Sequence, residues 1–455
     1  MDKGTVKDKK RQGSAGGSQL LSDKLYYFAK PVLGRLAQRL DRRLVQTFMD
    51  LLSVILMHRH RNNGLLLSEM GGQLLGMDRA PAGTKRIANL LHSKKWGSKL
   101  LDIWMWEQGD HKVGECMHPQ DDTYVIWDES EIEKAESLQP ERLCAVRSVK
   151  ARRLKRIKKG YFNPPGGRPI FVPGFHWFQI VVTGFKGVPC LAHFHWWTTR
   201  GEAASTLRDE EGAVLKQLAK RWGRQGIHVW DRGFAGAPWL LQALVAQVRF
   251  IVRWKKGNYL IDENGERRKA SDISRRKRSV DYRMIYDCKR RCERKTGIVF
   301  FPVKLPDIPY QTLWMIVSRP GPGRQPWFLL TNEPIPCVNE AWRIVLGYNR
   351  RWQIETCIRF DKSELAIESI RILDWETRKK FMLILALVHA FLLSLLTPAL
   401  QYLTSWLLRV WCHRTGKRSR SAAAPLYRLR LALSALWSAF RPLSLPRSSA
   451  ENRHI

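Results

Sequence analysis

One stretch of the chain carries acidic, basic and phenolic groups at helical spacing. Residues 348–362 read YNRRWQIETCIRFDK. At about 100° per residue of an α-helix, five polar side chains fall on one stripe, namely Tyr348, Arg351, Glu355, Arg359 and Lys362. The apolar Ile354, Ile358 and Leu365 fall on the opposite side, which can dock on a core. A single glutamate among cations indicates a metal-binding carboxylate flanked by groups that hold phosphates.

Two aspartates follow short apolar runs that have the composition of buried strands. Residues 124–127 read YVIW and lead into Asp128, and residues 227–230 read IHVW and lead into Asp231. A carboxylate has little to do inside a strand buried on both faces, whereas at the strand end it meets a ligand in the crevice beyond the sheet. Two carboxylates brought together repel each other, and a divalent cation relieves that repulsion. The alternative is that each aspartate only caps the turn that follows it.

The segments around these aspartates predict an α/β domain. Apolar periodicity and a turn at GFKG indicate alternating strands and helices, in the order strand 177–183, strand 188–196, helix 206–222, strand 227–230, helix 239–247 and strand 249–254. This is the order of a ribonuclease-H-like domain, which we assign to residues 119–254 and 331–385. The HFH sequence at 193–195 is a weak metal signal, because alternating histidines more often face solvent or DNA.

The N-terminal part is predicted to be helical. Residues 1–19 form a polar, basic tail that we expect to be disordered, and they lack the apolar core of a signal peptide. Residues 20–118 are expected to form a helical region that binds DNA ends, with helices at 36–57 and 82–96. In the second helix Thr84 is the expected N-cap, and Lys85 and Arg86 are candidate DNA contacts. The alternative is an ordinary helical bundle with a solvated basic face.

Residues 255–330 are predicted to be a β-rich insertion, with strands at 298–302 and 313–317 and a Gly/Pro loop before Trp327. Residues 386–455 are expected to form a helical C-terminal region with a basic tail that contacts DNA nonspecifically. Twenty mostly apolar residues at 381–400 are long enough to span a bilayer. A buried helix is favoured, because His389, Ser394 and Thr397 interrupt the run.

Composition points to a polyanionic partner. The 455 residues include 78 Lys and Arg against 41 Asp and Glu, which gives a formal charge of +37. Such an excess favours nucleic acid first and an anionic membrane surface second, because each neutralised phosphate releases counterions. The 8 cysteines are dispersed, with no second pair at zinc spacing beside Cys288 and Cys292. This distribution predicts reduced thiols and a cytoplasmic protein.

Several of these segments together resemble a known family. The stretch at 348–362 matches Y-x-x-R-x-x-x-E-x-x-x-x-x-x-K, the signature of the insertion sequence 4 family of bacterial DDE transposases, at Tyr348, Arg351, Glu355 and Lys362. Asp128 and Asp231 stand where that family keeps its other two carboxylates. The sequence WFLLTNEPI resembles the strand upstream of the signature, and Trp327 falls on a tryptophan that stacks against a flipped DNA base. The resemblance covers roughly residues 120 to 385.

The resemblance implies a role for each matched residue. Asp128, Asp231 and Glu355 would be the catalytic ligands of two Mg²⁺ ions, or of Mn²⁺. The DNA-binding set would comprise Tyr348, Arg351, Arg359, Lys362, Trp327, Lys85 and Arg86. The expected activity is cut-and-paste transposition, with metal-dependent cleavage at terminal inverted repeats and strand transfer into target DNA.

The expected partners are double-stranded DNA, as transposon ends and as target, and a second copy of the chain in a homodimer. We expect no membrane association and a place in the cytoplasm at the nucleoid. Two alternatives remain open at this point. One is a nuclease of the same fold that does not transfer strands, and the other is a DNA-binding regulator without catalysis.

Overall fold

The computed structural model describes residues 3–58, 65–115, 122–134, 139–149, 170–287, 292–412 and 426–442, and describes side chains from residue 13 onward. The chain divides into two compact units. Unit 1 comprises Met1–Glu107, Glu131–Phe175 and Cys357–Ile455, and unit 2 comprises Gln108–Ser130 and His176–Thr356. Three predicted features lie outside the described residues, namely most of the basic loop at 147–159, the C-terminal tail and Cys288.

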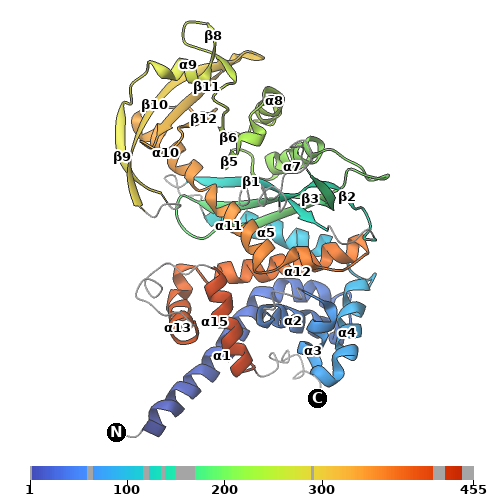
Figure 1. The fold of residues 1–455 in the computed structure, drawn as a ribbon. Coiled ribbons are helices and arrows are strands. Elements are labelled where there is room, and N and C mark those ends of the chain that lie inside the picture. Colours follow the sequence, from blue (N-terminus) through green and yellow to red (C-terminus); the bar gives the residue numbers. More distant parts are fainter. Residues whose placement is uncertain are drawn as a thin grey trace, which may run out of the picture. The chain divides into compact units, whose positions relative to one another are not determined.

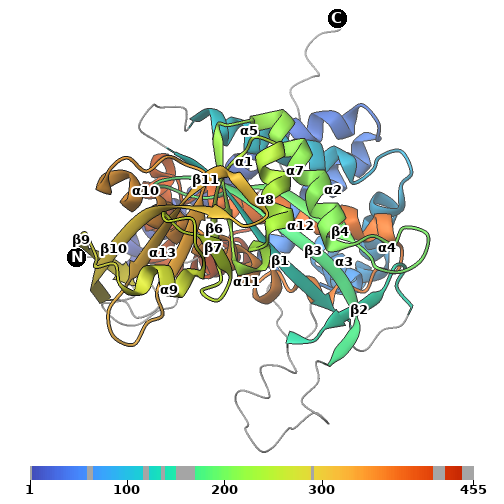
Figure 2. The ribbon, with the colours of Figure 1, turned by 90° about the horizontal axis from the view of Figure 1, so that it is seen from above.

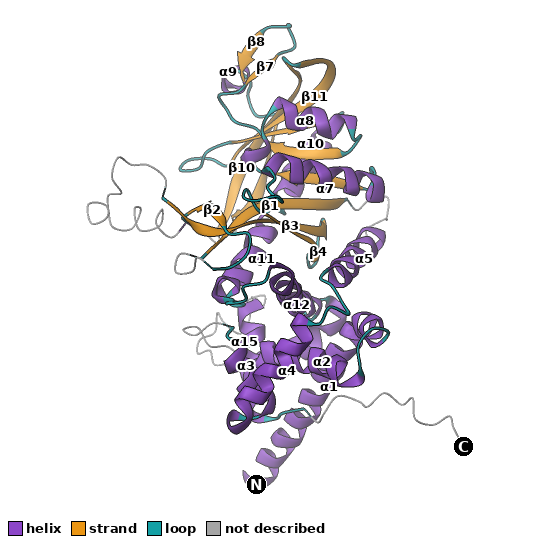
Figure 3. Cartoon of the chain, turned by 90° about the vertical axis from the view of Figure 1, so that its right-hand side faces the viewer, coloured by secondary structure: helices purple, strands orange, loops and turns teal. Residues whose placement is uncertain are grey.

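Unit 2 is built on a mixed sheet whose central strands are parallel (Figures 1 and 3). The first strands are β1 (Thr123–Glu133), β3 (Phe171–Gly184), β4 (Cys190–Trp197), β5 (Gly226–Trp230) and β6 (Arg249–Arg253). They follow the order β3-β1-β5-β6, with β4 paired to β3, and β5 runs parallel to both β1 and β6. Every residue of β5 is buried, as expected for a short strand covered on both faces.

The predicted alternation of strands and helices is confirmed in this part of unit 2. Between the strands lie the helices α7 (Leu207–Trp222) and α8 (Ala237–Val245), which were expected at 206–222 and 239–247. Thr206 caps α7 by accepting a hydrogen bond from the amide of Asp209. One expectation was wrong, because Asp128 lies within β1, which continues to Glu133.

The strands predicted as an insertion continue this same sheet (Figure 2). They are β7 (Tyr259–Ile261), β8 (Arg267–Lys269), β9 (Asp281–Asp287), β10 (Cys292–Leu305), β11 (Ile308–Arg319) and β12 (Trp327–Thr331). β12 pairs antiparallel with β6, and the order runs on as β6-β12-β11-β10-β7-β8, with β9 paired to β10. The helix α10 (Val338–Asn349) lies against β10 and β11. The short helix α9 (Ala270–Arg275) follows β8.

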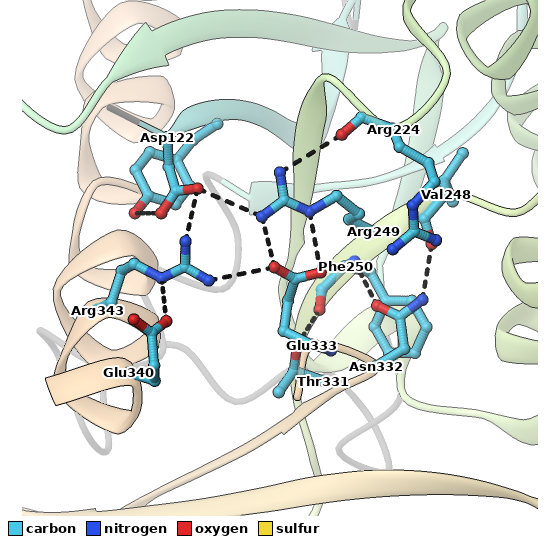
Figure 4. A network of polar contacts seen from close by, with 11 residues as sticks. Asp122, Arg224, Val248, Arg249, Phe250, Thr331, Asn332, Glu333, Glu340 and Arg343 are labelled. Carbon is cyan, nitrogen blue, oxygen red and sulfur yellow. Dashed lines mark hydrogen bonds and ion pairs between the residues drawn. The ribbon is translucent and has the colours of Figure 1, made fainter. Parts of the chain in front are cut away.

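A charged network joins the ends of three sheet elements of unit 2 to α10 (Figure 4). Glu333, which follows β12, accepts a hydrogen bond from Arg249 Nε at 2.9 Å. Arg249 also contacts Asp122, just before β1, at 3.3 Å. Arg343 on α10 reaches Asp122 at 3.1 Å and Glu333 at 3.3 Å. Two carboxylates and two guanidiniums therefore satisfy one another at the edge where β1, β6 and α10 meet.

Unit 1 is helical apart from the short strand β2 (Cys144–Arg147) and the ends of β1 and β3. Its N-terminal helices are α1 (Lys3–Ala37), α2 (Arg42–Met57), α3 (Leu67–Leu75), α4 (Ala80–His92) and the first part of α5 (Lys99–Glu115), which continues into unit 2. The C-terminal helices are α12 (Trp375–Ser394), α13 (Gln401–Trp411) and α15 (Leu426–Ala439), and α11 (Trp352–Ser363) crosses from unit 2 into unit 1. The short 3-10 turns are η1 (Met77–Arg79), η3 (Arg232–Phe234), η4 (Ile367–Ser369) and η5 (Pro398–Leu400).

The apolar run near the C-terminus is a buried helix, as favoured by the sequence. α12 packs against α1, α2, α4 and α15, and its apolar residues are buried all round. Among the described residues, no single helix has both the length and the apolar composition to cross a membrane. The pair formed by Trp375–Ser394 and Pro398–Trp411, bent by 74°, meets those criteria together.

Three helical predictions differ from the structure. α1 begins at Lys3, so residues 3–19, expected as a disordered tail, continue the helix that packs through Leu21 and Leu25. Thr84 lies inside α4, where its hydroxyl donates to the carbonyl of Ala80 at 2.8 Å instead of capping the helix. The helix expected at 36–57 is broken, because Asp41 caps the start of α2. The six cysteines among the described residues form no disulfide bond.

Candidate active site

The register of two parallel strands brings the predicted aspartates to one edge of the sheet. β1 and β5 are hydrogen-bonded with Ile126 opposite Val229. Asp128 and Asp231 each come two residues after this last registered pair, which places them at the same end of the two parallel strands. Asp231 also caps the turn that follows β5, because its Oδ1 accepts a hydrogen bond from the amide of Gly233 at 2.6 Å. Asp231 therefore does both things that the sequence offered as alternatives: it caps the turn that follows β5, and it lies near Asp128.

The signature stretch is two helices instead of one. α10 ends at Asn349 and α11 begins at Trp352. Between them, the amides of Arg350 and Arg351 bond back to Gly347 and Tyr348 at 3.0 Å, which is i→i+3 geometry. Tyr348 therefore lies on α10, whereas Glu355 and Lys362 lie on α11.

Arg351 joins two of the three carboxylates. Its guanidinium lies 3.8 Å from Asp128 Oδ2 and donates a hydrogen bond to Glu355 Oε1, one turn further along the chain. All three side chains are partly shielded, with exposed fractions of 17% for Arg351, 21% for Asp128 and 30% for Glu355. The contact brings β1 and the start of α11 together within unit 2.

The charge balance at Asp128 shows that the carboxylates act on one another. Burial raises the pKa of Asp128 to about 7, and the negative charges of Asp231 and Glu355 add to that rise. The positive charge of Arg351 opposes it. Asp128, Asp231 and Glu355 are therefore electrostatic neighbours, and ionising all of them at once is unfavourable without a cation.

The three carboxylates, Asp128, Asp231 and Glu355, are chemically suited to bind a hard divalent cation. Carboxylate oxygens are the ligands preferred by Mg²⁺, which bridges few carboxylates and keeps several waters. With the side chains as they stand, the described residues contain no group of three or more His, Cys, Asp or Glu arranged to hold a metal ion. Arg351 supplies the positive charge at Asp128 and Glu355 instead. The residues thus fit a metal by charge and ligand type, with Arg351 in the position of counterion.

Asp128→Asn is expected to stabilise the metal-free protein above pH 7. The folded pKa of Asp128, about 7, lies above its ordinary value of 3.8, so ionisation costs the folded state more than the unfolded state. Stability contributed by the protonated form is present below pH 4 and is lost between pH 4 and 7. The gain from the neutral amide should be about 1–3 kcal/mol at pH 8. Chemical denaturation in chelator at pH 4.5 and pH 8 measures it, and an equal effect at both pH values would contradict this account.

A cavity of about 520 Å³ in unit 2 adjoins Glu355 and Arg351. Trp327 and Tyr348 also line it, and their rings meet edge to face with centroids 5.3 Å apart. Burial raises the pKa of Tyr348, while the charges of Arg351 and Arg253 oppose that rise. Aromatic faces beside guanidiniums form a surface on which a base stacks and a phosphate binds.

Arg253 is a site residue that the sequence analysis missed. It lines the same cavity, and its guanidinium lies over the ring of Trp327, 5.9 Å from the ring centroid. The signal was present, because Arg253 ends β6 in the way that Asp231 follows the neighbouring parallel strand β5. Side chains at the same ends of adjacent parallel strands gather at one crevice.

The turn that carries Asp231 is held by a second missed residue, Arg208 on α7. Its guanidinium donates to Gly233 O at 2.7 Å and to Glu211 Oε2 at 2.6 Å. Burial, followed by the negative charge of Glu129, raises the pKa of Glu211 well above its ordinary value. Arg208 therefore positions the turn, and through it Asp231, while its positive charge opposes the rise in the pKa of Glu211.

Four predicted DNA contacts are not among the residues that line this cavity. Lys362 Nζ donates to the carbonyl of Glu131 and lies 3.7 Å from Glu368, both in unit 1. Arg359 is exposed on α11. On α4, Lys85 is exposed, whereas Arg86 donates to Thr47 Oγ1 at 2.8 Å and lies 3.6 Å from Asp50. Arg86 thus ties α4 to α2, and DNA binding by these four residues stays a prediction.

Comparison with known proteins relates part of the chain to transposases. Residues 174–391 match the model of the transposase DDE domain. Among solved structures, the chain is similar to the piggyBac transposase in a cryo-EM structure of its synaptic complex with hairpin DNA. That similarity has a TM-score of 0.40 and 12% sequence identity over 94% of this chain and 83% of the other, which is too low to establish a shared fold. The segment 174–391 of this chain is therefore similar to the DDE domain of transposases.

Proposed function

We propose that the protein is a cut-and-paste transposase of the insertion sequence 4 type, which cleaves DNA at terminal inverted repeats and transfers the ends into target DNA. The observation that carries the proposal is the contact of Arg351 with Asp128 and Glu355, in the electrostatic neighbourhood of Asp231. These residues come from three separate segments. Arg351 and Glu355 match the family signature, and Asp128 and Asp231 stand where the family keeps its other two carboxylates. The DDE domain match over 174–391 supports the reaction class.

Asp128, Asp231 and Glu355 are proposed to hold two divalent cations, Mg²⁺ or Mn²⁺, in a ribonuclease-H-like domain. Such ions, when bound, stabilise charge on the attacking and leaving oxygens of a phosphodiester. Arg351 neutralises Asp128 and Glu355 in this structure, so it becomes available to a DNA phosphate when those carboxylates gain another counterion. Tyr348 and Arg253 border the same cavity and orient the DNA strand there.

Cleavage and joining assays test this function. A duplex carrying the inverted repeats that flank the gene should be nicked in Mg²⁺ and then joined to a second DNA. Nicking without joining would favour the simple nuclease of the same fold. Binding without nicking in either Mg²⁺ or Mn²⁺ would favour the noncatalytic regulator. We expect two copies of the chain to pair two DNA ends, which sedimentation of the complex measures.

Trp327→Ala is expected to lower the rate of DNA excision by about 10- to 100-fold. Stacking of one displaced base on an aromatic ring contributes about 1–3 kcal/mol, and Trp327 lines the cavity next to Glu355. The variant should bind intact duplex as the parent does, because only a displaced base reaches the ring. Trp327→Phe should restore part of the rate. Full excision by the alanine variant would remove Trp327 from the site.

A further inference from the structure

A second cavity in unit 2 is formed by β7, β8 and α9. Its volume is about 460 Å³, and its lining is dominated by cations, comprising Tyr259, Arg267, Arg268, Lys269, Asp272, Arg275 and Arg276. We refer to these residues as the basic cavity. It shares no lining residue with the cavity at Trp327 and Glu355, so it is separate from the candidate active site.

The fold concentrates two basic runs of the sequence at this place. Residues 267–269 form β8, residues 275–276 end α9, and the short helix turns the chain back between them. The helix is anchored on its inner side by the buried Ala270, Ile273 and Ser274. The cations therefore stand on a fixed backbone, which lowers the cost of ordering them around a ligand.

Hydrogen bonds to backbone carbonyls hold this segment in place. The amide of Ala270 donates to Asn258 O at 3.0 Å, which closes the segment between β7 and α9. Arg319 on β11 donates to the carbonyls of Ser274 and Lys277 at 2.8 and 2.9 Å, which clamps the end of α9 to the main sheet. The side chains that line the basic cavity are not needed for these bonds.

The positive charge of the basic cavity is only partly compensated. Arg268 lies 3.5 Å from Asp262, and Arg275 lies 3.7 Å from Asp272. Within the described parts of the chain, no carboxylate lies at ion-pair distance from Arg267, Lys269 or Arg276. Arg267 is instead placed over the ring of Tyr259, 5.1 Å from its centroid. Like charges held this close attract a polyanion.

We propose that the basic cavity binds backbone phosphates of duplex DNA, as a second contact outside the active site. Guanidiniums fork onto phosphate oxygens, and lysine adds a point charge. The lining offers Tyr259 as its single aromatic residue and no aliphatic side chain, so it lacks the apolar face that would enter a membrane. The inference rests on the proposed function in one respect, that DNA is the polyanion this protein handles.

Charge reversal with a matched control tests the proposal. Lys269→Glu/Arg276→Glu removes two exposed cations of the basic cavity, and Lys216→Glu/Lys220→Glu makes the same charge change on the exposed face of α7. Fluorescence anisotropy in Ca²⁺ measures binding to an inverted-repeat duplex and to an unrelated duplex of equal length, from 50 to 200 mM salt. Thermal unfolding verifies that both variants fold. If Lys269→Glu/Arg276→Glu does not fold, the neutral variant Lys269→Gln/Arg276→Gln takes its place.

The cavity variant should bind about tenfold more weakly than the control at 100 mM salt. Its slope of log affinity against log salt should fall by about one to two units, because each phosphate contact contributes about 0.9. Loss with both duplexes assigns the cavity to target or flanking DNA, and loss with the inverted repeat alone assigns it to the transposon end. Equal affinity and slope in the two variants would overturn the proposal. It would also be overturned if the cavity variant lost binding to phosphatidylserine vesicles but bound both duplexes as the control does. Cleavage of transposon ends by the parent is scored separately, so the proposed function can stand while this inference fails.

Discussion

Alanine at Asp128, Asp231 or Glu355 is expected to slow metal-dependent cleavage by about 10³-fold or more, which corresponds to about 4 kcal/mol of transition-state stabilisation. Arg351 contacts two of the three carboxylates, Asp128 and Glu355, and burial together with its acidic neighbours raises the pKa of Asp128 to about 7. Removing any one of them takes away a proposed ligand for the divalent ions of the proposed reaction. Cleavage of an inverted-repeat duplex under single-turnover conditions measures the effect.

Binding and a surface control separate this effect from misfolding. Each variant should bind the duplex as the parent does in Ca²⁺, because DNA affinity comes mainly from cations. Glu202→Ala, which removes an exposed acid elsewhere in unit 2, should cut at the parental rate. If all three carboxylate variants cut as fast as Glu202→Ala, the assignment of the active site is wrong.

Glu333→Ala is expected to destabilise unit 2 by about 3–5 kcal/mol, because removing one partner of a buried ion pair leaves the other charge uncompensated. Glu333 is only 5% exposed and contacts both Arg249 and Arg343. Together with Asp122, these residues join β6, β12 and α10 (Figure 4). Urea unfolding of the full chain measures the loss, which should appear in the transition of the unit that contains the sheet.

The same carboxylate predicts how stability depends on acid. Burial acts to raise the pKa of Glu333, but the hydrogen bond and charge of Arg249 and the charge of Arg343 outweigh it, so the pKa lies below the ordinary value of 4.5. Its stabilisation is therefore complete above pH 4.5 and is lost as pH falls through the lowered pKa. The parent should lose this increment in acid, and Glu333→Ala should not.

Glu340→Ala is the matched control for this network. Glu340 contacts the same Arg343 at 2.7 Å but is 34% exposed, and exposed ion pairs contribute about 0–1 kcal/mol. A loss as large as that of Glu333→Ala would mean that burial does not set the strength of the network.

The sequence by itself determined which residue types stand at the candidate active site and which strands and helices form around them. The runs before Asp128 and Asp231 are short and apolar, which indicates buried strands whatever the rest of the chain does. Local capping chemistry likewise places the start of α7 at Thr206. These features depend on residues that are close together in the sequence, so they can be predicted from the sequence.

Tertiary structure decided what depends on segments far apart. The predicted single helix at 348–362 is broken between Asn349 and Trp352, within a stretch whose Arg350 donates to Thr183 Oγ1 at 2.8 Å. Local periodicity carries no information on that distant partner. The insertion strands extend the main sheet because β12 pairs with β6, and strand pairing of this kind is set by distant hydrogen bonds.

Ion pairs also depend partly on the sequence and partly on the tertiary structure. Positive residues near 351 and 86 are evident from the sequence, yet Arg351 meets two carboxylates while Arg86 ties two helices together. Arg253 and Arg208 carry no motif and gain their places only through the strand order and the turn at Gly233. The chain thus specifies its reactive groups locally, whereas their distances and charge balance come from the fold, because ionisation depends on every charge and buried surface nearby.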